Sequence, residues 1–326
     1  MKYSNTLHGY WFLGITVILI CLNNQINTIS ETYISLFCLF LILTIGISHG
    51  SLDNLKGNKI LKLYKIKNKF IFYLFYIVLA LLFTSLWLLI SSFTLMLFLI
   101  IASYHFGKED CAFINWDEDH FRLTTFSSNT RSVNKTLEPL YHLIKGSIII
   151  LAPLALHFNE TLSIFEILFI DNVSFKNILI HCDNNRIFVI TLWITAFISL
   201  SFFIETACII ALNIFFSPLV AFTIYFCFLH SIRHSASLIK YIIIEEEKVW
   251  KEHKRFVDVD INGVKKFVKK ALPLTLITAI LFIVSVYFLT NYYVLDDAIL
   301  KVIFIGLASL TFPHILLEYL LEKNEK

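Results

Sequence analysis

The chain has 326 residues, of which 57% are hydrophobic and 16% are charged, with a formal net charge of +3. Its mean hydropathy of +0.74 excludes an ordinary soluble domain. Long apolar stretches recur along the chain, and about twenty such residues are required to cross a bilayer core of roughly 30 Å. We therefore predict an all-α, polytopic transmembrane bundle of about 8–10 membrane helices. A single domain is expected over residues 1–326.

The apolar helices are expected, in chain order, at residues 10–22, 31–53, 70–90, 92–107, 140–157, 187–203, 205–217, 218–243, 272–291 and 298–320. The first run ends in LNNQINTIS, which lacks a small-residue cleavage site, so it is interpreted as a span and not as a signal peptide. Pro218 cannot donate a backbone hydrogen bond, and it is interpreted as a break between two spans.

Basic residues gather in two linkers between these helices. They are Lys56, Lys59, Lys62, Lys65, Lys67 and Lys69 in one, and Lys248, Lys251, Lys254, Arg255, Lys265, Lys266, Lys269 and Lys270 in the other. The positive-inside rule places both linkers in the cytoplasm, which requires an even number of spans between them. The break at Pro218 gives this number. We expect a multi-pass protein of the cell membrane with cytoplasmic N- and C-termini and no nucleic-acid partner.

Four histidines lie inside segments apolar enough to span a membrane: His49, His105, His230 and His234. An ionisable ring is costly in hydrocarbon unless something binds it. At a helical rise of about 1.5 Å per residue, all four lie in a band about 9 Å deep. His230 and His234 are spaced i, i+4 and so share one helix face, where two rings can bind one ion. The pattern predicts a metal site among the helices.

Several other residues are candidates to support this site. His314 has a similar depth to the four histidines. Asp53 follows His49 at i+4, and Glu109 and Asp110 follow His105 at i+4 and i+5. Such acids can accept the second N–H of a metal-binding imidazole. The alternative is that they are acids at the cytoplasmic interface.

The remaining histidines are expected elsewhere. His157 is expected near the opposite membrane face, and the others at the surface: His8, His120, His142, His181 and His253. Four imidazoles without an obvious carboxylate or thiolate ligand suit iron, copper or zinc. The six cysteines form no CxxC pair and are interpreted as small hydrophobic residues.

Five motifs follow one another along nearly the whole chain: GISHGSLD, YHFGKED, HLIKGSIIILAPLALHF, FCFLHSIRH and TFPHILLE. In this order they resemble the bacteriorhodopsin-related, Blh-type β-carotene dioxygenases of prokaryotes. Two positions depart from the pattern of that family. Ser48 replaces the usual proline before the first histidine, and Lys145 replaces an arginine before Gly146. Neither change affects an expected ligand.

The resemblance implies an integral-membrane, Fe(2+)-dependent enzyme of carotenoid catabolism and retinal biosynthesis. Such an enzyme cleaves β-carotene with O2 at the central 15,15′ double bond and forms two molecules of all-trans-retinal. The iron-binding histidines of the family match His49, His105, His230 and His234, which would be both the metal ligands and the catalytic residues. The expected partners are β-carotene, O2 and the lipid bilayer, with a rhodopsin as a candidate consumer of the retinal.

An apolar substrate dissolved in lipid predicts a pocket lined by aromatic and aliphatic side chains and open to the bilayer. Aromatic residues make up 16% of the chain, and six flank the expected ligands: Phe98, Tyr104, Phe106, Tyr225, Phe226 and Phe228. Packing of membrane helices is the alternative role for these side chains.

Three other functions are alternatives to the carotene dioxygenase. A di-iron lipid desaturase or hydroxylase should contain several HxxxH or HxxHH boxes, and this chain has a single HxxxH. An ion transporter should place carboxylates in mid-membrane, whereas Glu205 and Asp297 are expected at helix ends. A retinal-binding opsin needs a lysine deep in its last helix, and Lys301 lies at the start of that helix.

Overall fold

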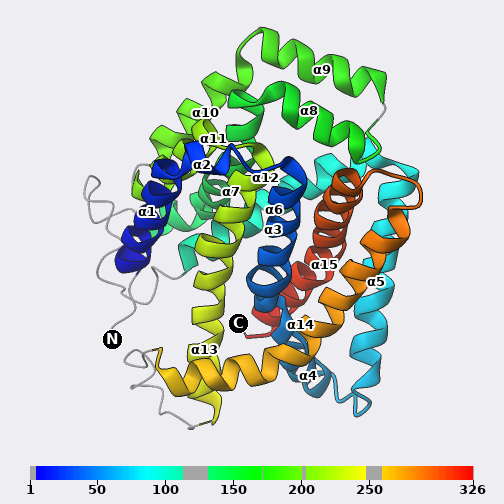
Figure 1. Cartoon of the computed structure of the whole chain (residues 1–326). Coiled ribbons are helices and arrows are strands. Elements are labelled where there is room, and N and C mark those ends of the chain that lie inside the picture. The colour runs from blue at the N-terminus through cyan, green and yellow to red at the C-terminus, as the bar shows by residue number, and fades with distance from the viewer. Residues whose placement is uncertain (1–4, 113–130, 171, 200–202, 247–258, 326) are drawn as a thin grey trace.

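The computed structural model describes residues 5–112, 131–170, 172–199, 203–246 and 259–325, without the side chains of residues 5, 6, 49, 112, 131–136, 244–246 and 325. All regular structure in these ranges is helical, so the all-α prediction is confirmed (Figure 1). The first half contains α1 (Asn5–Cys21), α2 (Asn23–Ile26), α3 (Glu31–Leu41), the π-helix η1 (Ile42–Gly46), the 3-10 helix η2 (Ile47–Leu52), α4 (Asp53–Leu63), α5 (Phe70–Leu89) and α6 (Ser91–Ala112).

The second half contains α7 (Arg131–Leu156), α8 (Phe158–Ile167), α9 (Val173–Asn184), α10 (Ile187–Ile198), α11 (Phe203–Phe215), α12 (Pro218–Ile224), the π-helix η5 (Tyr225–Ser231), α13 (Ile232–Glu246), α14 (Ile261–Leu289) and α15 (Leu295–Glu325). Each expected apolar range overlaps a helix. The structure adds α8 and α9, which lie across one end of the bundle at the top of Figure 1. Their sequences mix polar and apolar residues, so they contain no long apolar run and were not predicted.

Pro218 separates two helices as the sequence predicted. It occupies the start of α12, where its missing N–H costs no helical hydrogen bond, while α11 has already ended at Phe215. The chain then continues through η5 into α13. The helix that carries His230 and His234 is therefore a separate element.

Among the described residues, five helices are long and apolar enough to cross a membrane: Glu31–Leu63, Phe70–Leu89, Leu137–Leu156, Ile261–Leu289 and Leu295–Asn324. In the most apolar stretch of α5, and likewise of α14, only 11% of the residues are buried inside the protein. Apolar helices exposed in this way are suited to contact with lipid. Three shorter apolar helices, Leu7–Cys21, Ile187–Ile198 and Phe203–Phe215, accompany them. The total number of spans stays a prediction.

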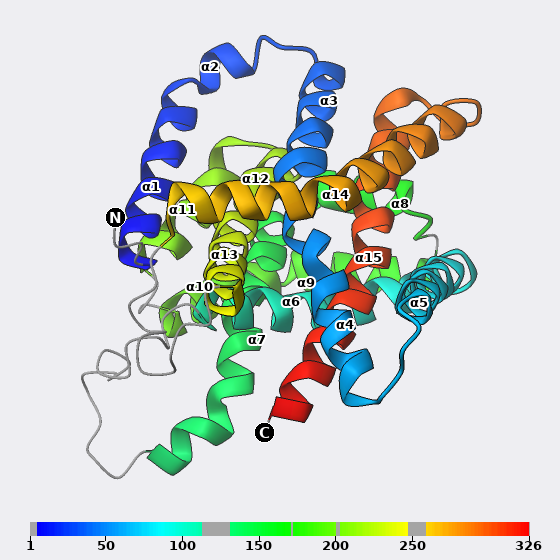
Figure 2. The ribbon, with the colours of Figure 1, turned by 90° about the horizontal axis from the view of Figure 1, so that it is seen from below.

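The basic segments lie at one end of the bundle. Lys56 of α4 binds Glu318 of α15 at 2.6 Å, and Lys108 of α6 binds Glu322 of α15. Figure 2, which views this end, shows α4, α13 and the first turns of α14 in front of the rest of the chain. This arrangement agrees with the two basic linkers sharing one side of the membrane. Residues 248–255 of the second linker lie outside the described residues, and the side itself stays a prediction.

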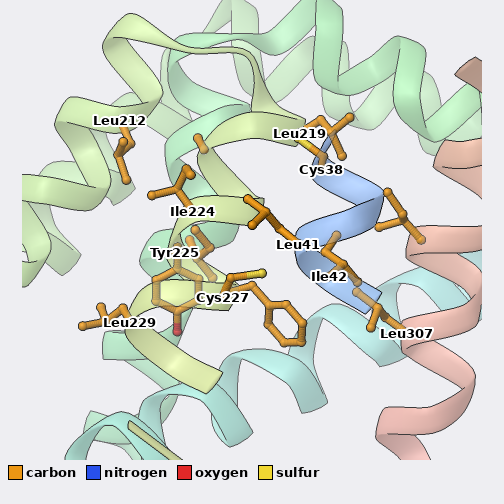
Figure 3. Close-up of a cluster of buried hydrophobic side chains, with 14 of the residues drawn as sticks. Cys38, Leu41, Ile42, Leu212, Leu219, Ile224, Tyr225, Cys227, Leu229 and Leu307 are labelled. Carbon is orange, nitrogen blue, oxygen red and sulfur yellow. The ribbon is translucent and has the colours of Figure 1, made fainter. Parts of the chain in front are cut away.

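A hydrophobic core joins the segments that surround the histidines. Cys38 and Ile42 from the α3–η1 segment pack with Leu219 of α12, Cys227 of η5 and Leu307 of α15 (Figure 3). Cys38 and Cys227 are buried free cysteines within this core, as expected of small hydrophobic residues.

α6 and α7 approach each other at a pair of glycines. A Cβ atom on Gly107 would lie 1.8 Å from the carbonyl oxygen of His142, and one on Gly146 would lie 1.8 Å from that of Ser103. Only glycine allows two helix backbones to touch in this way. The contact fixes α6, which carries His105, Glu109 and Asp110, against its neighbour.

Candidate metal centre

Four described histidines from three parts of the chain form one buried cluster. His105 belongs to α6, His230 to η5, His234 to the first turn of α13 and His314 to α15, and none is more than 4% exposed. The ring centroid of His105 lies 5.6 Å from that of His230 and 5.3 Å from that of His314. The ring of His234 lies 6.5 Å from His230 and 5.7 Å from His314. The four rings therefore surround a common centre.

The backbone of His49 lies in η2, and its side chain is outside the described residues. The structure thus brings together three of the four predicted ligands. It also adds His314, which was expected only in a supporting role.

Three of these imidazoles bind a carboxylate through Nδ1. The Nδ1 of His230 lies 3.2 Å from Oδ1 of Asp110, that of His234 2.7 Å from Oε2 of Glu109, and that of His314 2.8 Å from Oδ2 of Asp53. An ionised carboxylate can only accept, so each Nδ1 carries the proton. The lone pair is then on Nε2, the nitrogen that remains for a metal.

These pairings differ from those expected from sequence spacing. Each acid was matched with a histidine earlier in its own segment, but in the described contacts the acids of α4 and α6 bind histidines of α15, η5 and α13. Asp53 follows a 3-10 segment, in which residues i and i+4 do not share a face as they do in an α-helix. Glu109 and Asp110 reach across to the neighbouring helix, where the partner rings lie.

Glu318 is a site residue that the sequence reasoning missed. Its Oε1 lies 3.6 Å from Nε2 of His314 and 3.7 Å from Nε2 of His234, and its Oε2 lies 3.7 Å from Nδ1 of His105. The signal was available in TFPHILLE, because His314 and Glu318 have the same i, i+4 spacing as His230 and His234.

The donor set suits a metal ion. One potential ligand atom from each of His105, His314 and Glu318 lies within 4.8 Å of the others, and the same holds for Glu109, His234 and Glu318. Both groups share Glu318. Imidazole nitrogens with a carboxylate oxygen favour a transition metal over magnesium or calcium.

A buried polar network supports the cluster from behind. The hydroxyl of Tyr225 donates to Oδ2 of Asp110 at 2.7 Å, and the guanidinium of Arg233 donates to the backbone carbonyl of Asp110 at 2.9 Å. Arg233 also binds Glu205 at 2.6 Å, and Lys145 lies 3.5 Å from the other oxygen of Glu205. Glu205 is in the first turn of α11 as expected, but it is buried in this ion network. The network holds Asp110, and through it His230, in place.

The other histidines whose side chains are described do not join the cluster. His157 binds the backbone oxygen of Asn213 at 2.6 Å, and His181 is exposed as predicted. The surface prediction was wrong for His8 and His142, which are buried beside aromatic rings, Trp11 at 5.6 Å and Tyr104 at 6.1 Å respectively. His120 and His253 lie outside the described residues.

Aromatic rings pack against the cluster on its apolar side. Phe106 meets His230 edge to face with centroids 4.8 Å apart, and Phe226 stacks on His230 at 5.8 Å. Tyr104 and Phe228, also expected near the substrate, instead contact His142 and Trp11.

Comparison with known proteins gives a consistent result. The family model described as "Beta-carotene 15,15′-dioxygenase" matches residues 40–322. A protein named "Beta-carotene 15,15′-dioxygenase" from uncultured marine bacterium 66A03 is 27% identical over 286 residues, which cover 86% of this chain and 90% of that relative. No solved structure shows significant similarity to the chain. Because the family model covers most of the sequence, including every residue of the histidine cluster, this protein belongs to the β-carotene 15,15′-dioxygenase family.

Proposed function

We propose that this membrane protein cleaves β-carotene with O2 at the 15,15′ double bond and forms two molecules of all-trans-retinal. The observation that carries the proposal is the buried cluster of His105, His230, His234 and His314, in which three rings have their Nδ1 fixed by carboxylates. Family membership adds the reaction class. The chain is proposed to act as a single membrane domain over residues 1–326.

The proposed ligands of Fe(II) are His49, His105, His230 and His234. His314 and Glu318 lie beside these histidines and are further candidates for a single position. When bound, Fe(II) would supply the redox chemistry by which ground-state dioxygen reacts with an alkene. The chain itself orients the ligands: Asp53, Glu109 and Asp110 hold the imidazole N–H groups.

The apolar surroundings of the cluster suit the substrate. Phe106 and Phe226 cover His230, so a polyene next to the metal would lie against aromatic faces and away from water. β-Carotene dissolves in the bilayer and would enter from lipid. The retinal would leave into lipid for a consumer such as a rhodopsin.

The test is expression in cells that accumulate β-carotene, followed by pigment extraction and metal analysis of the purified protein. Loss of orange colour with formation of retinal is expected for the parent chain. His105→Ala, His230→Ala and His234→Ala should lose both retinal formation and bound iron. His157→Ala is the matched control, since its ring binds Asn213 outside the cluster, and it should retain both. Full iron occupancy and turnover in His230→Ala would contradict the proposed ligand set.

A second candidate is a membrane oxygenase with two irons. It is favoured by the two groups of potential ligand atoms that share Glu318, because a shared carboxylate can bridge two metals. The iron content of the purified protein separates the two functions, since one iron per chain is expected for the carotene dioxygenase. An opsin-like function is not favoured, since the Lys301 ammonium donates to the carbonyl of Ile167 and lies 3.5 Å from the centroid of the Phe169 ring.

A further inference from the structure

Two cavities flank the histidine cluster on different sides. Cavity A lies between α6, α7, α8 and α15, and its lining includes Phe98, Leu99, Phe106, Ile150, Phe222 and Leu307. Cavity B lies between η2, α5, α14 and α15, and its lining includes Tyr76, Ile77, Phe226, Thr278, Leu307 and His314. Their volumes are about 100 Å³ and about 240 Å³. Each is smaller than the roughly 300–1,000 Å³ of pockets that enclose a drug-sized ligand. Neither alone holds a forty-carbon polyene.

The two cavities meet at the cluster. Leu307 lines both of them, and His314 itself lines cavity B. Phe222 of cavity A stacks on Phe226 of cavity B, with ring centroids 5.4 Å apart and planes inclined by 10°. Phe106, which lines cavity A, and Phe226, which lines cavity B, both pack against the ring of His230. The junction between the cavities is therefore beside the proposed metal.

The cavities differ in their access to the membrane. Cavity B is lined in part by Ile77 of α5 and by Ile277 and Leu281 of α14, whose side chains are 55%, 55% and 59% exposed. Most apolar side chains of these two helices face outward. No residue that lines cavity A is exposed. Cavity B therefore borders the outward-facing side chains of α5 and α14, and cavity A lies deeper among the helices.

We propose that cavities A and B bind the two halves of one linear apolar polyene, which enters from lipid through cavity B and extends past the histidine cluster into cavity A. This inference rests on the proposed function. Cleavage of a symmetric substrate at its central bond requires equal lengths of substrate on both sides of the reacting atoms. A cavity on each side of the cluster provides a place for each half, and the extent of cavity A limits how far the substrate can pass the metal.

Two tryptophan substitutions test the arrangement. Leu99→Trp fills cavity A, and Thr278→Trp fills cavity B. The matched controls are Ile100→Trp and Ile280→Trp on the outer faces of the same helices, where the side chains are 56% and 58% exposed. Bound iron at the parental level in all four variants shows that the cluster is intact.

The substrates are β-carotene and a β-apocarotenal, which has one ring and one shortened half. Leu99→Trp should lose about 10²-fold in β-carotene cleavage, because the reacting bond is displaced. It should still cleave the apocarotenal, whose short half needs less of cavity A. Thr278→Trp should lose both activities, since both substrates enter through cavity B. The two controls should match the parent with both substrates.

The inference would be overturned if Leu99→Trp cleaved β-carotene and the apocarotenal in the same ratio as the parent does. A parent chain that makes no retinal would instead refute the proposed function. The inference is then decided by the β-carotene that the iron-free protein retains, measured from its visible absorption. Less retention in Leu99→Trp and Thr278→Trp than in their controls supports the two-cavity site, and equal retention contradicts it.

Discussion

Glu205→Gln is expected to be one of the most destabilising single substitutions in the chain. Glu205 accepts from Arg233 at 2.6 and 3.3 Å and has Lys145 3.5 Å away. The three residues are 6%, 1% and 3% exposed. A glutamine keeps the shape but removes the negative charge and turns one acceptor into a donor that faces a cation.

The magnitude follows from the burial of the network. An exposed ion pair contributes about 0–1 kcal/mol, but removal of one partner of a buried pair costs about 3–5 kcal/mol. That cost corresponds to roughly a hundredfold to several thousandfold in the ratio of folded to unfolded protein. Bound iron should also fall, because Arg233 holds the backbone of Asp110, whose carboxylate binds His230.

The assay is unfolding of the purified protein in mixed micelles with increasing denaturing detergent. Lys145, Arg233, Glu205 and the nearby Asp110 contain two positive and two negative charges, so Glu205→Gln leaves one excess positive charge. The double variant Glu205→Gln with Lys145→Met restores the balance and should lose less stability than the sum of the two single changes. An unfolding midpoint equal to that of the parent in Glu205→Gln would refute this reasoning.

Four further predictions concern other parts of the structure. Glu318→Gln should lower bound iron and retinal formation, measured together on purified protein, and unchanged values would remove Glu318 from the site. Asp110→Asn should remain folded but lose about 10- to 100-fold in iron affinity or activity, with partial recovery in excess ferrous iron. Gly107→Ala should destabilise the α6–α7 contact by at least about 1–3 kcal/mol, while Gly14→Ala, whose Cβ meets nothing within 4 Å, should match the parent in thermal stability. Leu307→Ala should widen the junction of the two cavities, let the polyene shift along it and yield aldehydes other than retinal, detected by chromatography; retinal alone would show that Leu307 does not position the polyene.

The apolar helices could be predicted from the sequence because hydrophobic runs of this length leave few alternatives in a membrane. Pro218 was interpreted correctly for the same kind of local reason, since a proline at a helix start needs no N–H partner. The amphipathic α8 and α9 were missed, because their short mixed sequences do not form apolar runs.

The site was predictable in part. Equal depth in the membrane grouped His105 with His230 and His234, and the structure brings these three together. The acid partners could not be read from spacing within one helix, since Glu109 and Asp110 bind rings on a neighbouring helix. Which helices are neighbours is a property of the tertiary fold. Glu318 was missed because its proximity to His105 and His234 depends on how α15 packs against α6 and α13.

The two π-helices in the described part of the chain make the site sensitive to chain length. η1 and η5 pack against each other, and the hydroxyl of Ser231 in η5 donates to the carbonyl of Gly46 in η1 at 3.0 Å. Gly46 also lies under the ring of Phe226, where a Cβ would come within 2.7 Å. A π-turn contains one residue more than an α-turn, so loss of one residue from Tyr225–Ser231 would return the segment to α-helical geometry and turn the side chains within it, His230 included, relative to His234. Substitutions can therefore accumulate along these two segments much more readily than insertions or deletions.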